Sequence, residues 1–223
     1  LVDCSNSAYQ MRQAGFATVS NAPMRSSDTP ANTASGQTYG WVTAPDASNW
    51  YFTQDITSRD SVFSEFYTAH FHESSKITLF DNNHKQVGSF SVKVPEGWKH
   101  VADITPYGPI TKKLFDRDEK SNEILVEFHD AFNGANKYLT RAYDINTGEI
   151  KFEMEGTGLV FDASKGWNSY QRLIMTHESD EKYSIDVIAP PANGQTDWTV
   201  EHTFNFDIDN KITYLQGSCF NCM

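Results

Sequence analysis

Short runs of large apolar side chains, each ended by a polar turn, recur along the chain from Trp50 onward. Three of these runs end on an aromatic residue followed directly by aspartate, at Phe80, Tyr143 and Phe206. The aromatic positions are separated by 63 residues in both intervals. An equal spacing that occurs twice indicates internal repetition, so we expect three tandem copies of one structural unit.

Each unit contains four apolar segments joined by polar turns, which predicts four antiparallel strands. The second segment of each unit places apolar residues around one acidic side chain (Glu65, Glu127 or Asp186), a pattern typical of a largely buried strand. The predicted strands are 50–52, 62–66, the run to Phe80 and 87–94; then 114–115, 124–128, the run to Tyr143 and 149–155; then 173–175, 183–187, the run to Phe206 and 211–216.

The predicted fold class is all-β, with three four-stranded antiparallel units that resemble propeller blades. Closed propellers usually have about four to eight blades, so three units leave the ring open unless other segments or chains complete it. An open arrangement, or a sandwich of antiparallel sheets, is therefore the alternative.

Residues 1–45 differ in composition from the rest and are predicted to form an N-terminal extended or linker segment. Within them, Ser26–Gly36 is small and polar and is expected to be a loop. A short helix over Tyr9–Thr18 and a strand over Tyr39–Val42 are also expected. The repeat domain is predicted to span 46–223, with units at about 46–106, 107–166 and 167–223.

Two motifs carry a resemblance to a known group of proteins: Leu114–Lys120 (LFDRDEK) and Tyr143–Glu149 (YDINTGE). With them, the stretch 46–216 resembles the β-propeller-like segments of large secreted and surface proteins of Bacteroidetes-type bacteria. The first unit departs from the pattern at Phe52–Asp55 and the third at Met175–Glu178. The resemblance implies an extracellular or cell-surface location and a scaffold, adhesin or secreted factor.

Composition narrows the range of partners. The chain has 223 residues, of which 39% are hydrophobic and 21% charged, as in globular proteins. Its formal net charge is −11, which repels phosphate backbones and argues against nucleic-acid binding. No apolar stretch approaches the roughly 20 residues of a membrane-spanning helix.

Two groups of side chains are candidate metal ligands. The turn residues Asp144, Asn146 and Glu149, like the pair Asp207 and Asp209, offer oxygen ligands that suit calcium. The same residue types also favour ordinary hairpin turns, and this is the interpretation we prefer. His70 and His72 are two residues apart on a predicted strand and share a face, but the sequence supplies no third ligand.

Carboxylates, tryptophans and cysteines are the other candidates for a functional role. Acidic pairs such as Asp116 with Asp118, and Asp180 with Glu181, resemble the carboxylate pairs of glycoside hydrolases, although any acidic protein holds many such pairs. The tryptophans Trp41, Trp50, Trp98, Trp167 and Trp198 lie near unit boundaries, where they suit either packing between units or a carbohydrate or peptide surface. The cysteines Cys4, Cys219 and Cys222 are expected to form a disulfide or remain free thiols.

We therefore assign no catalytic, cofactor-binding or metal-ligating residue and no cofactor. The expected function is a non-enzymatic extracellular β-repeat module that serves as a structural, adhesive or binding element, with a carbohydrate or protein ligand. Two alternatives remain: a secreted polysaccharide hydrolase that uses a carboxylate pair, and a subunit that completes a larger β assembly with further repeats or partner chains.

Overall fold

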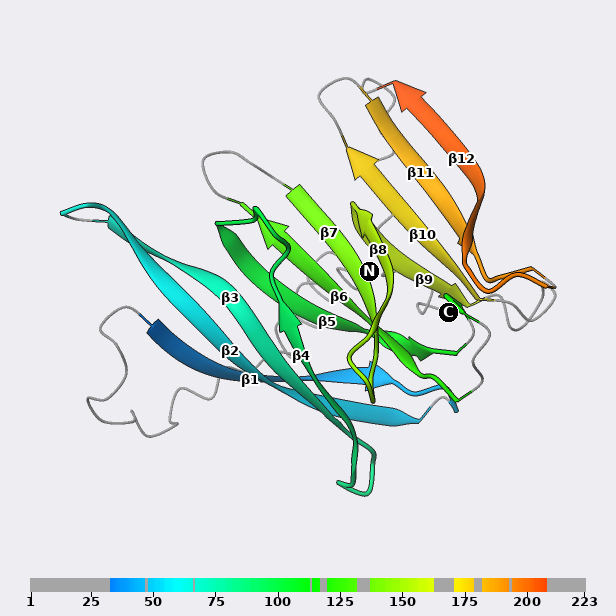
Figure 1. Ribbon diagram of the computed structural model, residues 1–223, viewed down its shortest axis with the longest axis horizontal. Coiled ribbons are helices and arrows are strands. Elements are labelled where there is room, and N and C mark those ends of the chain that lie inside the picture. Colours follow the sequence, from blue (N-terminus) through cyan, green and yellow to red (C-terminus); the bar gives the residue numbers. More distant parts are fainter. Residues whose placement is uncertain are drawn as a thin grey trace, which may run out of the picture.

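The computed structural model describes residues 33–207, apart from residues 47, 66, 113, 117–119, 132–136, 163–170, 179–181 and 193. Twelve strands form three four-stranded antiparallel sheets, here called sheets A, B and C (Figure 1). Sheet A contains β1 (Thr33–Thr43), β2 (Asn49–Ser64), β3 (Tyr67–Phe80) and β4 (Gln86–Lys93). Sheet B contains β5 (Val101–Thr111), β6 (Glu123–Asp130), β7 (Lys137–Asp144) and β8 (Ile150–Glu155). Sheet C contains β9 (Thr157–Asp162), β10 (Gln171–Glu178), β11 (Lys182–Ala189) and β12 (Thr199–Asp207).

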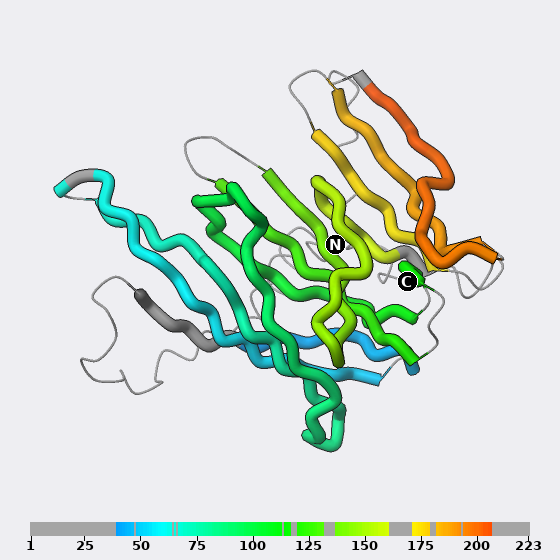
Figure 2. Tube along the Cα trace, viewed as in Figure 1, coloured from blue at the N-terminus to red at the C-terminus, as the bar shows by residue number. Residues whose placement is uncertain are grey.

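The fold class predicted from the sequence is confirmed. Within each sheet every strand pairs with the next strand along the chain, so each sheet is a simple antiparallel meander. The chain passes once from sheet A through sheet B to sheet C (Figure 2). The three sheets do not close into a barrel, in agreement with the open alternative. No helix in the described part of the chain is long and apolar enough to cross a membrane.

Several predicted strand limits are wrong. The strand expected at 39–42 is longer, and β1 takes in Thr33–Gly36 from the predicted polar loop, because backbone pairing with β2 does not require large side chains. The apolar run predicted as a separate strand over 62–66 is not one: residues 62–64 end β2, at the exposed end of the β2–β3 hairpin, and residue 66 lies outside the described residues. Leu114 and Phe115 are buried in the loop between β5 and β6 instead of forming a strand.

The sheets also divide the chain differently from the predicted units. They cover 33–93, 101–155 and 157–207, because β9 belongs to the third sheet. Only Gly156 separates β8 from β9, and its φ of +116° is accessible to glycine and strained for other residues. The division of the chain into a linker and a repeat domain stays a prediction. The predicted helix 9–18, the predicted strand 211–216 and all three cysteines lie outside the described residues.

Sheet B is the middle layer, since a separate hydrophobic cluster covers each of its faces. The first cluster joins sheets A and B, with Phe52, Leu79 and Phe90 from sheet A packed against Val126 and Phe128 from β6. Burial of this many large apolar side chains, at about 25 cal/mol per Å², is the main contribution that holds the two sheets together.

The second cluster joins sheets B and C, where Leu125, Phe152, Leu173 and Met175 are buried together. Residues 124–126 of β6 are all buried and alternate between the two clusters, so this strand is apolar on both faces. The largely buried strand predicted over 124–128 is therefore confirmed.

Gly88 of β4 lies close to the backbone of sheet B. A Cβ atom placed on Gly88 would lie 2.5 Å from the backbone oxygen of Ile145, in the turn between β7 and β8. Real Cβ atoms do not approach backbone oxygens so closely. A residue without a side chain is therefore required at this position in β4.

Candidate functional site

The aromatic–aspartate motifs supply turn-capping carboxylates. Asp144 Oδ1 accepts hydrogen bonds from the backbone N–H groups of Asn146 and Thr147, both at 2.8 Å, and Oδ2 accepts one from the Ser121 hydroxyl at 2.6 Å. Burial opposes ionisation of Asp144, but these hydrogen bonds outweigh it and lower the pKa. Glu149 pairs with Lys151 at 2.7 Å. In this turn the carboxylates already have protein partners, which is the arrangement of an ordinary hairpin turn.

The two histidines considered as a metal pair bond to different neighbours. His70 Nδ1 lies 2.6 Å from Asp60, whereas His72 Nδ1 lies 2.8 Å from the hydroxyl of Ser58. Burial lowers the pKa of His72, and the negative charge of Asp103 partly offsets that effect. The described residues contain no group of three or more side chains suited to hold a metal ion.

The acidic residues predicted at equivalent repeat positions do not occupy equivalent places. Glu65 lies in the turn between β2 and β3, Glu127 in the second strand of sheet B, and Asp186 in the third strand of sheet C. Asp186 accepts a hydrogen bond from the Thr203 hydroxyl and lies 3.1 Å from His177 Nε2.

Only Asp116 of the predicted acidic pairs lies in the described part of the chain. Asp116 pairs with Lys151 at 3.3 Å. Its predicted partner Asp118 lies outside the described residues, as do Asp180, Glu181 and Asp209.

One buried acid was missed by the sequence analysis. Glu123, at the start of β6, is 0% exposed; its Oε2 accepts a hydrogen bond from Thr111 at 2.8 Å, while its Oε1 has no partner among the described residues. Burial raises the pKa of Glu123 to about 8, and the negative charge of Asp116 adds to the effect. The sequence around Glu123 does not indicate that this acid is buried, because both faces of β6 are covered only when the two other sheets pack against it.

The tryptophans divide into two groups. Trp50 and Trp98 are partly buried against the first cluster, and Trp198 against the second, where it contacts Phe152 edge-on at 4.8 Å. These three therefore pack within or between sheets. Trp41 instead is 61% exposed on β1. Trp167 lies outside the described residues.

Trp41 begins a row of aromatic rings on the face of sheet A that points away from sheet B. Strand register places Trp41 opposite Tyr51, and Tyr51 opposite Phe80. Tyr51 and Phe80 stack with ring centroids 5.1 Å apart, and Trp41 meets Tyr51 edge-on at 5.8 Å. We call Trp41, Tyr51 and Phe80 the aromatic row.

The residues beside the aromatic row on the same face are mainly polar. The next row contains Tyr39, Thr53, Thr78 and Ser89, and the hydroxyls of Thr78 and Ser89 lie 3.1 Å apart. The following row contains Asp55 opposite Lys76, both exposed. This face therefore places an open indole beside hydroxyl, carboxylate and ammonium groups, a combination suited to bind a ligand that is partly apolar and rich in hydroxyls.

A second exposed feature is the end of the β2–β3 hairpin. Beyond Arg59, β2 has no pairing with β1, and the segment of β3 before Ser74 has no pairing with β4. The hairpin therefore continues as a two-stranded ribbon that projects from sheet A (Figure 1), with Val62 74% and Tyr67 53% exposed near its end. A shallow hollow of about 400 Å³ also lies on the β11–β12 loop, lined only by residues 194–199.

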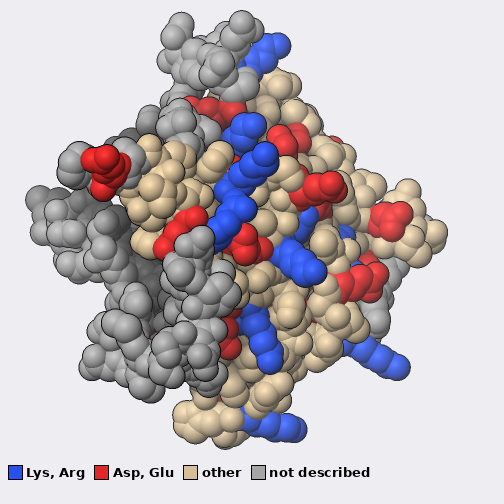
Figure 3. Space-filling model, turned by 60° about the vertical axis from the view of Figure 1, so that its left-hand side comes forward, with Lys and Arg blue, Asp and Glu red and all other residues tan. Residues whose placement is uncertain are grey.

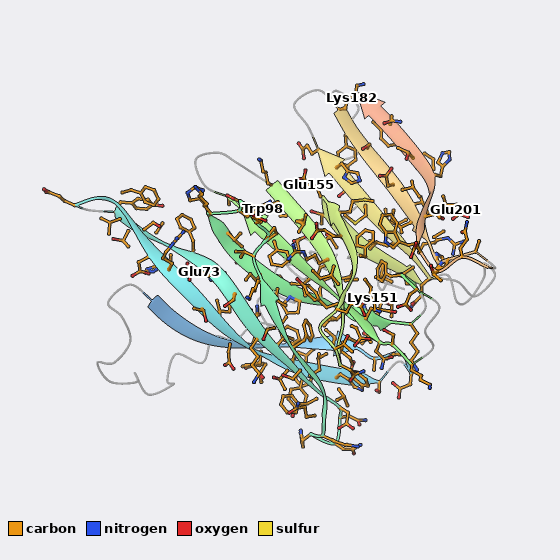
Figure 4. The ribbon with its side chains drawn as sticks, viewed as in Figure 1. Glu73, Trp98, Lys151, Glu155, Lys182 and Glu201 are labelled. Carbon is orange, nitrogen blue, oxygen red and sulfur yellow. The ribbon has the colours of Figure 1, made fainter. Side chains whose placement is uncertain are left out.

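Charged residues of both signs are mixed on the described surface. Figure 3 shows Lys and Arg interspersed with Asp and Glu over the face in view. Glu73, Lys151 and Glu201 lie on sheets A, B and C respectively (Figure 4). Each has an ion-pair partner: Arg59 at 3.6 Å, Glu149 at 2.7 Å and Arg172 at 2.7 Å.

Comparison with known proteins adds no family to this description. No protein-family model, curated protein sequence or solved structure matches the chain. The resemblance to propeller-like segments of bacterial surface proteins therefore stays a prediction from the sequence.

Proposed function

We propose that the chain is a non-enzymatic extracellular binding module and that the outer face of sheet A binds carbohydrate. The observation that carries the proposal is the exposed indole of Trp41 at the start of the aromatic row, on a sheet face that also presents Thr53, Asp55 and Lys76. A large apolar ring left open to water on such a face suits ligand binding better than folding.

Sugars match this combination of groups. One face of a pyranose ring presents C–H groups that pack on an aromatic ring, while its hydroxyls need hydrogen-bond donors and acceptors. Trp41 meets Tyr51 edge-on and is 61% exposed, so most of its ring surface is open for the apolar side of a sugar. Thr53, Asp55 and Lys76 then supply hydroxyl, carboxylate and ammonium groups on the same face.

The charge distribution favours a neutral ligand. A formal net charge of −11 disfavours polyanions, including nucleic acids and acidic polysaccharides. Of the carboxylates that were candidates for hydrolysis, Asp116 lies in the described part of the chain, and it pairs with Lys151.

The test is a calorimetric titration of the protein with neutral hexasaccharides: cellohexaose, xylohexaose and chitohexaose. Trp41→Ala is expected to weaken binding of the preferred sugar about tenfold, equal to about 1.4 kcal/mol. Tyr67→Ala is the matched control, because it removes another exposed aromatic ring at the far end of the β2–β3 hairpin. Absence of binding to all three sugars, or equal affinities of the wild type and Trp41→Ala, would contradict the proposal.

The extracellular or cell-surface location is supported by the resemblance to secreted and surface proteins. Its test is labelling of intact source cells with an antibody against the protein. Signal from intact cells or from the culture medium is expected, and signal that appears only after lysis would contradict it.

A second candidate function is a subunit of a larger β assembly. Phe204 is 46% exposed on β12, and Leu159 is also exposed on sheet C. Among the described strands β12 pairs only with β11, so it is an edge strand. Light scattering of native material should then give a mass above the 25.2 kDa of one chain, and Phe204→Asp should reduce it. A monomer at all concentrations would exclude self-assembly.

A further inference from the structure

Two hairpin turns in the molecule are closed and capped in a similar way, although the second is one residue longer. In the turn between β3 and β4, the backbone N–H of Asp81 donates to the carbonyl of Lys85 at 2.9 Å. In the turn between β7 and β8, the N–H of Asp144 donates to the carbonyl of Glu149 at 2.9 Å. Both aspartates also accept two backbone N–H groups on Oδ1. The two turns can therefore be compared position by position from their closing residues.

The residue just before the closing residue is left-handed in both turns. It is Gly148 in the second turn, with φ of +73°, and His84 in the first, with φ of +64°. Glycine adopts this conformation at little cost, whereas a residue with a Cβ atom is strained there. Among the described residues, His84 is the only one other than glycine with a positive φ. The fold thus keeps a histidine where the matching turn has glycine.

The imidazole of His84 explains why a side chain is kept at this position. Its Nδ1 lies 3.1 Å from the hydroxyl of Tyr51, and the two rings meet edge to face with centroids 5.8 Å apart. Tyr51 is the central ring of the aromatic row, between Trp41 and Phe80. His84 is exposed, so its ring extends the row at the surface of sheet A. Strained residues that persist in this way are concentrated at functional sites.

We propose that His84 is a contact residue of the carbohydrate-binding face and holds the Tyr51 hydroxyl in position for the ligand, at a cost to the stability of its own turn. The inference rests on the function proposed above and adds a residue from a turn, where no strand pattern indicates a ligand contact. It assigns the polar end of the aromatic row to the pair of His84 and Tyr51. The sugar ring then packs on Trp41 and directs a hydroxyl toward this pair.

The test separates stability from binding by comparing two substitutions. His84→Gly removes both the ring and the strain, so its Tm should equal that of the wild type or exceed it by about 2–4 °C. Its affinity for the preferred hexasaccharide should still fall about tenfold. His84→Ala keeps the strained conformation and removes the ring, so affinity should fall and Tm should not rise. Asn82→Ala, an exposed change in the same turn, is the control and should alter neither quantity.

A further variant tests the hydroxyl itself. Tyr51→Phe keeps the stacked ring and removes the group bonded to His84, so it should weaken binding while Tm stays within about 2 °C of the wild type. Equal affinities of His84→Gly and the wild type would overturn the inference and leave the proposed function intact. A fall in Tm of His84→Gly that matches its loss of binding would also overturn it, because His84 would then be structural. No binding by the wild type would contradict the proposed function and the inference together.

Discussion

Sheets A and B have the same strand order and hydrogen-bond pattern, yet their side chains are distributed differently. In β3 of sheet A, buried and exposed residues alternate. Ser75, Ile77 and Leu79 are buried, whereas Lys76 is exposed. In β6 of sheet B, Ile124, Leu125 and Val126 are all buried. The difference arises because sheet A is covered on one face and sheet B on two.

This comparison shows where a ligand can be bound. Each face of sheet B contributes to a hydrophobic cluster, so it has no open face to offer. The outer face of sheet A lies outside both clusters, so its residues do not have to be apolar for the sheets to pack. Polar residues beside an exposed Trp41 on this face are therefore consistent with selection for binding, as proposed above.

The largest expected effect comes from truncating a side chain in the middle layer. Phe128 of β6 is 0% exposed in the first cluster, and the Arg141 guanidinium lies 5.2 Å from its ring centroid. Phe128→Ala should lower the free energy of unfolding by about 3–5 kcal/mol, because the cavity between two packed sheets cannot collapse. Urea unfolding followed by circular dichroism measures this change.

Thr53→Ala on the outer face of sheet A is the matched control. Thr53 is exposed, and its substitution should change the free energy of unfolding by no more than about 0.5 kcal/mol. Similar losses of unfolding free energy for the two variants would contradict the difference between the sheets, because they would mean that both sheets are covered to the same extent.

The sequence predicts the middle layer well and the edges of the sheets poorly. The run 124–128 is apolar apart from Glu127 and is a strand, as expected. Val62 and Phe63 begin a run that looks similar but lie at the exposed end of a hairpin, since apolar periodicity alone does not reveal which face is covered.

The three equally spaced aromatic residues occupy equivalent structural positions only in part. Phe80 and Tyr143 lie at the ends of the third strands of sheets A and B, where aspartate caps the following turn. Phe206 instead lies near the end of β12, the last strand of sheet C. The insertion of β9 directly after β8 displaces the third sheet relative to the motif.

The candidate site could not be predicted from the sequence, because it depends on the register of three strands. Trp41, Tyr51 and Phe80 come together only when β1 pairs with β2 and β2 with β3. The contribution of His84 depends on a single backbone dihedral angle in a turn. Sequence patterns do report which residues share a face within one strand, but not which residues face each other across strands.

A pH titration sharpens the comparison, because sheet B holds a fully buried acid, Glu123. Its pKa is about 8 in the folded state, against about 4.5 for an exposed glutamate. Between these values the folded chain keeps a proton that the unfolded chain releases, so stability falls as the pH rises. The slope for this group is at most about 1.4 kcal/mol per pH unit, and the loss is complete above pH 8.

Glu123→Gln should remove this slope and be more stable than the wild type above pH 8, as measured by urea unfolding from pH 3 to 9. Glu201→Gln is the control of opposite sign. The Arg172 side chain lowers the pKa of Glu201, so its stabilising contribution is present at neutral pH and is lost as the pH falls through the lowered pKa. That effect is small because Glu201 is exposed. Parallel pH profiles for wild type and Glu123→Gln would contradict the burial of this acid.

The smallest expected difference is between the two capping aspartates. Asp144→Ala should lower the free energy of unfolding by about 1–3 kcal/mol, because it leaves two backbone N–H groups and the buried Ser121 hydroxyl without their acceptor. Asp81→Ala removes two similar backbone hydrogen bonds, but in an exposed turn where water can replace them, so about 0.5–1 kcal/mol is expected. Urea unfolding at pH 7 compares the two losses. Equal losses would show that the turn after the third strand is as well solvated in sheet B as in sheet A. Sheet B would then be buried on both faces along its strands but not at its turns.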